Sequence, residues 1–415
     1  MFLLSGEHMI HENLISESLK TPVCYECDVC VAGGGVAGIA AALSAARASK
    51  KLNRPPRVIL LERSYMLGGL ATAGLVTIYL PICDGYGNQV CFGLGEELLH
   101  LSIEHGAEAR YPTPWLKGGT KEERFQRFEV QFNAQLFAIS AEQLLLSEGV
   151  QILYGATAVA CVTADDKITH VMIEGKGGRE AIKIDSSVVD ATGDADICKL
   201  AGAKTELFRE GNKLAAWYYG YGNHDFNLYM CGVHDTPDTQ GNTELADTRR
   251  WGGLETAELS ELMQVTHASL LNNLLRRREE IPDLVPVTIG TLPEIRMTRR
   301  LCGVYTQDIT EEAVHYPDTV GIFPNWRKRG PVYELPLSTL YGKEVKNLLA
   351  AGRCISGTDA MWDITRVIPV CAVSGEAAGA AAVFSDDMTK INIEQLQNYL
   401  REAGVLLSWT VQDHA

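Results

Sequence analysis

The sequence predicts an α/β fold with a Rossmann-like nucleotide-binding domain, and three observations lead to this prediction. A short apolar run at 29–32 is followed by three glycines and an alanine-rich segment at 36–46, which is typical of a buried parallel strand, a tight turn and a helix. A second apolar strand follows at 57–61. Near the C-terminus, an apolar strand at 345–350 precedes a small-residue helix at 371–382, so the chain is expected to return to the same sheet.

The first turn has the glycine spacing of a dinucleotide site. Gly33, Gly35 and Gly38 form the pattern G-x-G-x-x-G. In this spacing the first glycine permits the tight turn, the second lets a pyrophosphate approach bare backbone, and the third lets the helix pack closely on its strand. The phosphates would lie against the free N–H groups and the positive dipole end of the helix. The pattern is common by itself, so the surrounding sequence decides whether it marks a dinucleotide site.

Glu62 provides this context. It ends the second strand and lies 24 residues after Gly38, whereas about 20 residues is the usual distance. The extra residues lie in a polar loop at 50–56. A carboxylate at this place accepts both hydroxyls of an adenosine ribose. The alternative is an ordinary βαβ unit with a coincidental glycine turn.

A second glycine pair, Gly68-Gly69, follows just beyond Glu62-Arg63. It indicates a chain that passes close to the far half of a long dinucleotide. The combination of G-x-G-x-x-G, Glu-Arg and Gly-Gly resembles the FAD-binding domain of the glutathione-reductase-like flavoprotein superfamily. Within it, residues 68–76, GGLATAGLV, more narrowly resemble the bacterial FAD-dependent oxidoreductase family.

The resemblance extends to the middle of the first domain. A strand at 150–153 and an antiparallel excursion at 157–163, 168–174 and 180–184 resemble the β-meander that replaces a crossover helix in this superfamily. A separate short strand at 188–190 precedes the family's Ala-Thr-Gly motif. The resemblance thus implies an FAD-binding domain with a parallel sheet and a β-meander, interrupted by an inserted α+β substrate or cap domain.

The composition of the chain suggests where these domains divide. The central region has aromatic clusters at 217–221, polar loops at 235–247 and a long predicted helix at 255–280. We expect 1–200 and 336–415 to form the two parts of the FAD-binding domain, and 201–335 to form the substrate or cap domain.

Local patterns predict further elements. Residues 1–26 are expected to be irregular, and helices are expected at 92–105, 128–147 and 393–403, with Gly149 as a C-terminal cap. An Asp N-cap at Asp194 or Asp196 is expected after the strand at 188–190. The helix at 128–147 is predicted to bury one apolar face, formed by Phe132, Leu136, Ile139, Leu144 and Leu145.

The resemblance also implies which residues hold FAD. Backbone of the first meander strand would hold the adenine, and a closing motif at 345–354 would complete the site. The implied cofactor-binding residues are Gly33, Gly35, Val36, Ala37, Gly38, Glu62, Arg63, Gly68, Gly69, Leu70, Ala71, Thr72, Ala158, Ala191, Thr192, Gly193, Gly352, Arg353, Arg366, Ile368 and Val370.

Three arginines are the candidates for catalysis. In this superfamily the helix at 371–382 points its N-terminus at the pyrimidine edge of the flavin, where the reduced ring carries negative charge that N–H groups and the helix dipole stabilise. Arg366 would add a full positive charge there. Arg296 and Arg299 are candidate ligands of an anionic substrate, although arginines that pair with carboxylates for structural reasons are the alternative. The proton-transfer residue is left open among His224, His234, His267, His315, Tyr218, Tyr219 and Tyr221.

These features predict an FAD-dependent oxidoreductase that transfers a hydride between flavin and an unidentified small molecule, with an electron donor or acceptor that is also unidentified. One alternative is a fumarate-reductase-like enoate reductase, in which Arg296, Arg299 and Arg366 clamp a carboxylate. Another is a non-catalytic binding protein that keeps the fold, as Rab GDP-dissociation inhibitors do. A second G-x-G-x-x-G is missing between 195 and 345, and no C-x4-C follows Gly68-Gly69, which disfavours pyridine-nucleotide and dithiol reductases.

Composition restricts the partners and the location. The chain of 415 residues has a net charge of −15 and a pI near 5.2, which disfavours nucleic acid as a partner. Eleven cysteines without a secretory leader favour a cytoplasmic protein, and no run of 18 apolar residues predicts a membrane span. Cys24, Cys27 and Cys30 resemble part of a cluster motif, but Gly34 stands where the fourth ligand belongs, so no metal site is predicted.

Overall fold

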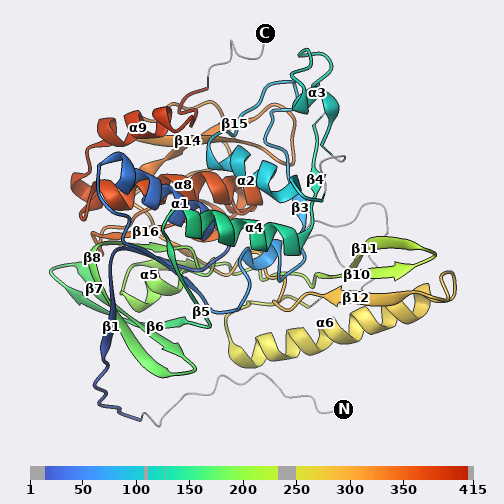
Figure 1. Ribbon diagram of the computed structural model, residues 1–415, viewed down its shortest axis with the longest axis horizontal. Helices are drawn as coiled ribbons and strands as arrows, with labels where there is room; N and C mark the ends of the chain where they lie inside the picture. Colours follow the sequence, from blue (N-terminus) through green and yellow to red (C-terminus); the bar gives the residue numbers. More distant parts are fainter. Residues whose placement is uncertain (1–14, 107–110, 126, 232–248, 410–415) are drawn as a thin grey trace.

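The central sheet of the computed structural model has the predicted parallel arrangement (Figure 1). Strands β5 (Gln151–Tyr154), β2 (Val58–Glu62), β1 (Val23–Ala32) and β8 (Gly178–Asp190) lie side by side, and β16 (Leu348–Ala350) pairs with the end of β8. All four pairings are parallel, which confirms the Rossmann-like α/β fold class. The structure describes residues 15–106, 111–125, 127–231 and 249–409.

Strand β8 belongs to both the parallel sheet and the meander. Its first half pairs antiparallel with β7 (Lys167–Gly175), which pairs in turn with β6 (Thr157–Ala164). The sequence predicts two strands at 180–184 and 188–190, and this is wrong because one strand of 13 residues continues through both. The polar residues between them stay in the strand because Ser186 and Ser187 donate hydrogen bonds to the carbonyls of Ala382 and Ser385.

Helices α1 (Val36–Lys51) and α8 (Ile368–Phe384) pack against each other at unusually short range. A Cβ added to Gly375 would lie 2.2 Å from the Ala37 carbonyl oxygen, and one added to Gly379 would lie 2.0 Å from that of Ala41. Glycine is therefore required on α8 for the two backbones to meet. This contact joins the first glycine turn to the last part of the chain.

Several boundaries differ from the sequence expectation, and those of β1, α2 and α4 differ for reasons that the structure shows. Strand β1 starts at Val23, inside the predicted irregular segment, because it pairs along β8 from Ala181 onward. Helix α2 spans Leu94–Ile103, and helix α4 spans Ala134–Ser147 after an Asn133 N-cap. The expected apolar face of α4 is wrong, since Ile139 is exposed and the buried residues are Ala134, Phe137, Ala138, Ala141 and Leu145. Residues 128–132 are not helical, so the helix begins at Ala134 and the buried face is formed by other residues than the sequence predicts.

The central region forms a separate layer that projects from the main sheet in Figure 1. Strands β10 (Ala216–Gly222), β11 (Asp225–Cys231) and β12 (Val285–Ile289) form an antiparallel sheet. Helix α6 (Thr256–Arg277) packs on this sheet and forms a small core with it. Strands β14 (Thr319–Pro324) and β15 (Val332–Pro336) contribute instead to the main core, so the domain division at 335 stays a prediction.

The remaining elements are short, and two helices among them matter for the site. Helix α7 (Asp359–Thr365) precedes α8, and α9 (Ile393–Glu402) covers it. In the described ranges no single helix is long and apolar enough to span a membrane; α7 and α8 meet that requirement only as a pair, which is bent by 91°. The other short elements are Gly69–Ala71 (η1), Ile78–Tyr79 (β3), Thr113–Leu116 (α3), Val130–Gln131 (β4), Asp196–Leu200 (α5), Thr205–Leu207 (β9), Arg299–Leu301 (β13), Leu337–Thr339 (η3), Gly352–Cys354 (η4) and Met388–Lys390 (η5).

A buried acid on α8 should make folding stability depend on pH. Glu376 is 5% exposed and accepts a hydrogen bond of 2.8 Å from the Leu94 backbone N–H, and burial raises its pKa to about 8. The folded state therefore binds more protons than the unfolded state between about pH 4.5 and 8, so stability falls as the pH rises through this window. We expect Glu376→Gln to remove this loss, which is at most roughly 5 kcal/mol. Urea unfolding of the parent protein and of Glu376→Gln at pH 5 and pH 8 measures this loss of stability. The same loss in both proteins would contradict the expectation.

Candidate functional site

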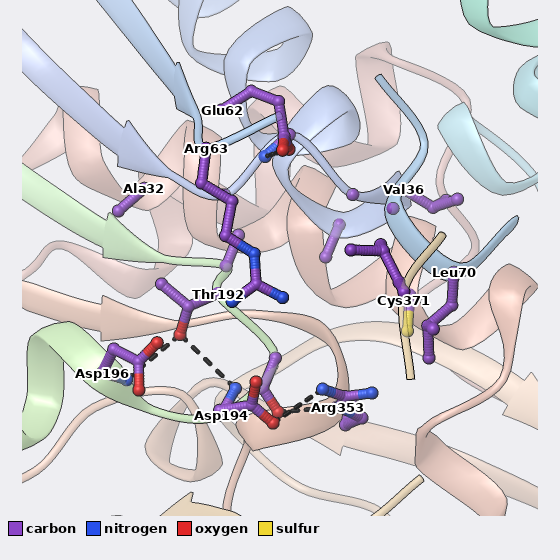
Figure 2. Close-up of a pocket in the computed structure, with 18 of the residues that line it drawn as sticks. Ala32, Val36, Glu62, Arg63, Leu70, Thr192, Asp194, Asp196, Arg353 and Cys371 are labelled. Atoms are coloured by element: carbon purple, nitrogen blue, oxygen red, sulfur yellow. Dashed lines mark hydrogen bonds and ion pairs between the residues drawn. The ribbon is translucent and has the colours of Figure 1, made fainter. Parts of the chain in front are cut away.

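One cavity contains most of the predicted cofactor residues. It lies at the carboxyl ends of β1, β2 and β8 and is bordered by the start of α1 and α8 (Figure 2). Of the predicted residues, the cavity is lined by Gly33, Gly35, Val36, Ala37, Glu62, Arg63, Gly68, Gly69, Leu70, Ala71, Ala158, Ala191, Thr192, Gly193, Arg353, Arg366 and Ile368. Their roles toward FAD stay predictions, but their convergence from segments far apart in the sequence is a property of the fold.

The three glycines of the first turn differ in what surrounds them. A Cβ on Gly33, which has a φ of +103°, would lie 2.4 Å from the Ala191 carbonyl oxygen, and one on Gly38 would lie 1.8 Å from that of Gly33. These two glycines are required by the protein itself. Gly35 has no heavy atom within 4 Å of its would-be Cβ. The space beside Gly35 is therefore open cavity, as a bound pyrophosphate requires.

The second glycine pair packs directly on this turn. The Gly68 N–H donates a hydrogen bond of 2.7 Å to the Gly34 carbonyl, and Gly68 forms a bridge with Gly35. A Cβ on Gly69 would lie 3.2 Å from the Gly35 Cα. Gly68 and Gly69 also have φ values of +100° and +55°, in the region that favours glycine. The pair thus lines the cavity with backbone and leaves room for a long ligand.

Glu62 is held in place by the protein before any ligand arrives. The residue is 7% exposed. Its Oε2 accepts a hydrogen bond of 2.9 Å from the Gly34 N–H, and its Oε1 accepts hydrogen bonds of 2.7 Å from the Ser64 N–H and hydroxyl. A carboxylate has about four acceptor positions. Three are used, so the geometry favours one hydrogen bond from a ribose rather than the two that the sequence predicts.

A buried aspartate shapes the loop after β8. Asp190 Oδ1 accepts hydrogen bonds from the Thr192 N–H and hydroxyl, and Oδ2 accepts one from the Cys198 N–H. Burial raises the pKa of Asp190. The expected Asp N-cap is wrong: Ala195 holds the N-cap position of α5, and the Thr192 hydroxyl accepts from the Asp196 N–H instead.

Arg353 and Arg299 both bind this loop. Arg353 donates to the Gly193 carbonyl and forms an ion pair of 2.7 Å with Asp194, as Figure 2 shows. Arg299 donates to the Asp194 carbonyl and pairs with Asp196 at 2.6 Å. Arg299 and Arg296 do not line the cavity. Arg299 thus pairs with a carboxylate of this loop, as the structural alternative to substrate binding expects. Its role as a substrate ligand stays a prediction.

Arg366 lines the cavity where α7 ends and α8 is about to begin. Its Nη2 lies 2.6 Å from Asp363 Oδ1, and Asp363 also pairs with Arg327. Burial opposes ionisation of Asp363, but the two arginines hold its pKa below the usual value. The Asp363 carboxylate thus lies between two guanidinium groups close to the N-terminus of α8.

Four predicted residues lie behind the cavity lining instead. Gly38 and Gly352 allow close packing, and the Gly352 N–H donates to the Ser374 hydroxyl. Thr72 is fully buried and donates to the Leu67 carbonyl, and Val370 is fully buried in α8. They support the lining without forming it.

None of the described candidates for proton transfer lines this cavity. His224 lies at an exposed turn and His267 on an exposed part of α6, whereas His315 pairs with Glu334. The hydroxyl of Tyr218 bonds to Asn273 and that of Tyr219 to Thr77. Tyr221 is exposed, and His234 lies outside the described residues.

The cavity also has lining residues that the sequence did not predict. Cys371 lies one helical turn after Ile368, but the predicted helix starts at 371 whereas α8 starts at Ile368, so the sequence did not place the two residues on one helix face. Burial raises the pKa of Cys371 to about 12. The central region contributes Gly253, Leu259, Leu292, Pro293 and Ile295. The long-range packing of the central region brings these five residues to the cavity. In the described residues no group of three or more His, Cys, Asp or Glu side chains can hold a metal ion.

A comparison with protein-family models agrees with an FAD-binding site. The family model "FAD dependent oxidoreductase" matches residues 28–217 and 215–400. No curated protein of known function matches the chain. Similar solved structures include a geranylgeranyl bacteriochlorophyll reductase-like protein from Thermoplasma acidophilum (13% identity over 92% of this chain and 82% of that one, TM-score 0.45) and p-nitrophenol 4-monooxygenase from Pseudomonas putida (11%, 91% and 84%, TM-score 0.44).

The two matched segments together cover most of the chain. The cavity also fits the cofactor that the family uses, since a Cβ at Gly35 would fill the space that a pyrophosphate needs. The protein is therefore an enzyme with FAD as its cofactor, and it belongs to the FAD-dependent oxidoreductase family.

Proposed function

We propose that this enzyme transfers a hydride between FAD and a small-molecule substrate that binds beside Arg366 and the first turn of α8. The observation that supports this most is the position of Arg366 on the cavity lining, with Asp363 shared between Arg366 and Arg327. Bound FAD supplies the redox chemistry, by accepting a hydride from a C–H bond or donating one to an activated double bond.

The proposed binding roles follow the order of the residues along the cavity. Glu62 and the backbone at Ala158 would hold the adenosine end. The N–H groups of Gly33 and Gly34 already donate to the Leu61 carbonyl and to Glu62. The backbone N–H groups from Gly35 onward, at the start of α1, would therefore bind the two phosphates. The first turn of α8 and Arg366 would meet the ring.

The chain's own groups would favour negative charge at the ring end of the cavity. The free N–H groups at the N-terminus of α8 carry partial positive charge, and the guanidinium of Arg366 lies on the same part of the cavity lining. Pro369 stands in the first turn of α8, where its missing N–H removes no helical hydrogen bond. These groups are fixed by packing in advance, so they need little reorganisation when charge develops.

The central region would provide the substrate side. Leu292, Pro293 and Ile295 present mainly apolar surface to the cavity, which would limit the access of water. An enoate reductase needs cationic groups for a carboxylate. Arg299 is already bound to Asp194 and Asp196, so this alternative is less well supported than general hydride transfer.

The cysteines support a cytoplasmic location as part of the same proposal. All eleven are free thiols in the structure. Free thiols persist in a reducing compartment.

Anaerobic mixing of the FAD-loaded enzyme with panels of hydroxy acids, sugars, amines and enoates tests the proposal. We expect one donor class to bleach the visible absorbance of the flavin, or one acceptor class to restore it after chemical reduction. A protein that binds no FAD on reconstitution, or whose flavin responds to no class while it is reduced normally by dithionite, would contradict hydride transfer and favour a binding role.

A further inference from the structure

Two aspartates of the loop after β8 line the cavity. Figure 2 shows Asp194 and Asp196 below the guanidinium of Arg63. Asp194 is paired with Arg353 at 2.7 Å, and its side chain is 17% exposed. Asp196 is paired with Arg299 at 2.6 Å, yet its side chain is 41% exposed. Asp196 is thus the more accessible of the two acids to a molecule bound in the cavity.

The backbone of this loop holds Asp196 close to the first glycine turn. A Cβ on Gly33 would lie 2.4 Å from the Ala191 carbonyl oxygen and 2.9 Å from the Thr192 Cα, so the loop packs directly on the turn. The Thr192 hydroxyl in turn accepts a hydrogen bond of 3.1 Å from the Asp196 N–H. Thr192 therefore connects Asp196 to the turn that leads into α1, where the phosphates are proposed to bind.

The surroundings of Asp196 disfavour its ionised form. Burial, together with the carboxylates of Asp190 and Asp194, raises the pKa of Asp196 to about 6. The guanidinium groups of Arg299 and Arg63 act in the opposite direction. The titratable and charged groups on the elements around Asp196 are Asp190, Asp194 with its partner Arg353, Arg63, Arg299 and, on β6, the Cys161 thiol.

Bound FAD would shift this balance further toward the neutral acid. Its two phosphates are anionic, and added negative charge near Asp196 disfavours the carboxylate. The phosphates would also attract Arg63, so that less of its positive charge acts on Asp196. A ligand that covers the exposed part of the Asp196 side chain removes water from the carboxylate as well. All three effects favour protonation of Asp196 in the complex.

We propose that Asp196 takes up a proton from water when FAD binds, so that the enzyme holds its cofactor more tightly in mildly acidic than in neutral solution. The inference goes beyond hydride transfer, but it rests on the proposed position of the phosphates. Because the complex binds more protons than the free protein, FAD affinity is highest below the pKa of Asp196 in the free protein. The affinity falls as the pH rises through that value, and it levels off above the higher pKa in the complex.

Calorimetric titration of FAD into the full-length apoprotein tests the proposal without turnover. Titrations at pH 5.5, 7 and 8 give the Kd, and two buffers of different ionisation enthalpy at pH 7 give the number of protons taken up. We expect the Kd to rise at least about fivefold from pH 5.5 to pH 8, with uptake of about half a proton at pH 7. In Asp196→Asn the uptake should vanish, and the Kd should change by less than about twofold over this range.

Glu174→Gln on the meander is the matched control. It removes a carboxylate that pairs with Arg179 at 3.2 Å and does not line the cavity. This control should keep the pH dependence of the parent protein. A parent Kd that does not change with pH, a parent that takes up no proton, or equal pH dependences in the parent and Asp196→Asn would overturn the proposal.

A second variant serves if Asp196→Asn does not fold, as judged by circular dichroism. Arg299→Gln removes a cation that lowers the pKa of Asp196, so it should move the pH dependence of the Kd to higher pH. An unchanged midpoint in this variant would also overturn the proposal. Hydride transfer is measured separately, on the FAD-loaded enzyme at a single pH. A flavin that responds to a substrate class while the Kd of FAD does not depend on pH would remove this inference and leave the proposed function standing.

Discussion

A Gly35→Val variant should fold like the parent protein yet bind FAD poorly. The new side chain would meet no protein atom, because nothing lies within 4 Å of the would-be Cβ, and Gly35 has a φ of −68°, which valine accepts. Its methyl groups would occupy the space reserved for the phosphates. We expect the Kd of FAD to rise by at least about a hundredfold, or roughly 2.7 kcal/mol. Flavin fluorescence titration of the apoprotein measures it.

The matched control is Gly177→Val in the meander turn. This glycine also has open space around its would-be Cβ and lies outside the positive-φ region, but it does not line the cavity. The control should bind FAD as the parent does, and both variants should unfold within about 1 kcal/mol of it. Normal FAD affinity in Gly35→Val would mean that the phosphates lie elsewhere.

Arg366→Ala should keep FAD but slow flavin reduction by about a hundredfold. The lost charge lies beside the N-terminus of α8, whereas the Asp363 carboxylate keeps Arg327 as its partner and is not left alone. The midpoint potential of the flavin should also fall, by about 30 mV for each 1.4 kcal/mol of lost stabilisation. Anaerobic stopped-flow reduction and a redox titration measure the two effects.

Arg327→Ala separates charge from position in this experiment. It removes the other partner of Asp363 but does not change a residue that lines the cavity. We expect it to have a much smaller effect on the potential. Similar effects of the two changes would mean that Arg366 acts mainly by holding Asp363, and unchanged reduction in Arg366→Ala would remove it from the mechanism.

Local patterns predicted the parts of the site that sequence neighbours determine. Gly33 follows β1 directly and Glu62 ends β2, where apolar runs identify the strands, and parallel pairing then brings these two ends together. Gly68 belongs to the glycine pair that follows Glu62-Arg63. The family resemblance added Arg366. These residues line one cavity, as their place along the sheet requires.

What the sequence did not provide depends on long-range packing. Arg299 forms an ion pair with Asp196, which lies about a hundred residues earlier in the chain. Strand β8 continues without a break because two of its serines form hydrogen bonds with the chain at the end of α8. Leu292 and Pro293 reach the cavity through the packing of the central region. Neither periodicity nor spacing reports such pairings, because they join segments with no common local pattern.

The packing of α1 on α8 has a consequence for synthesis of the protein. The phosphate turn is translated within the first tenth of the chain, yet Gly375 and Gly379, against which α1 rests, emerge from the ribosome more than three hundred residues later. The nascent enzyme cannot complete its cofactor pocket until this late helix is released. Loading with FAD is therefore expected to be a post-translational event.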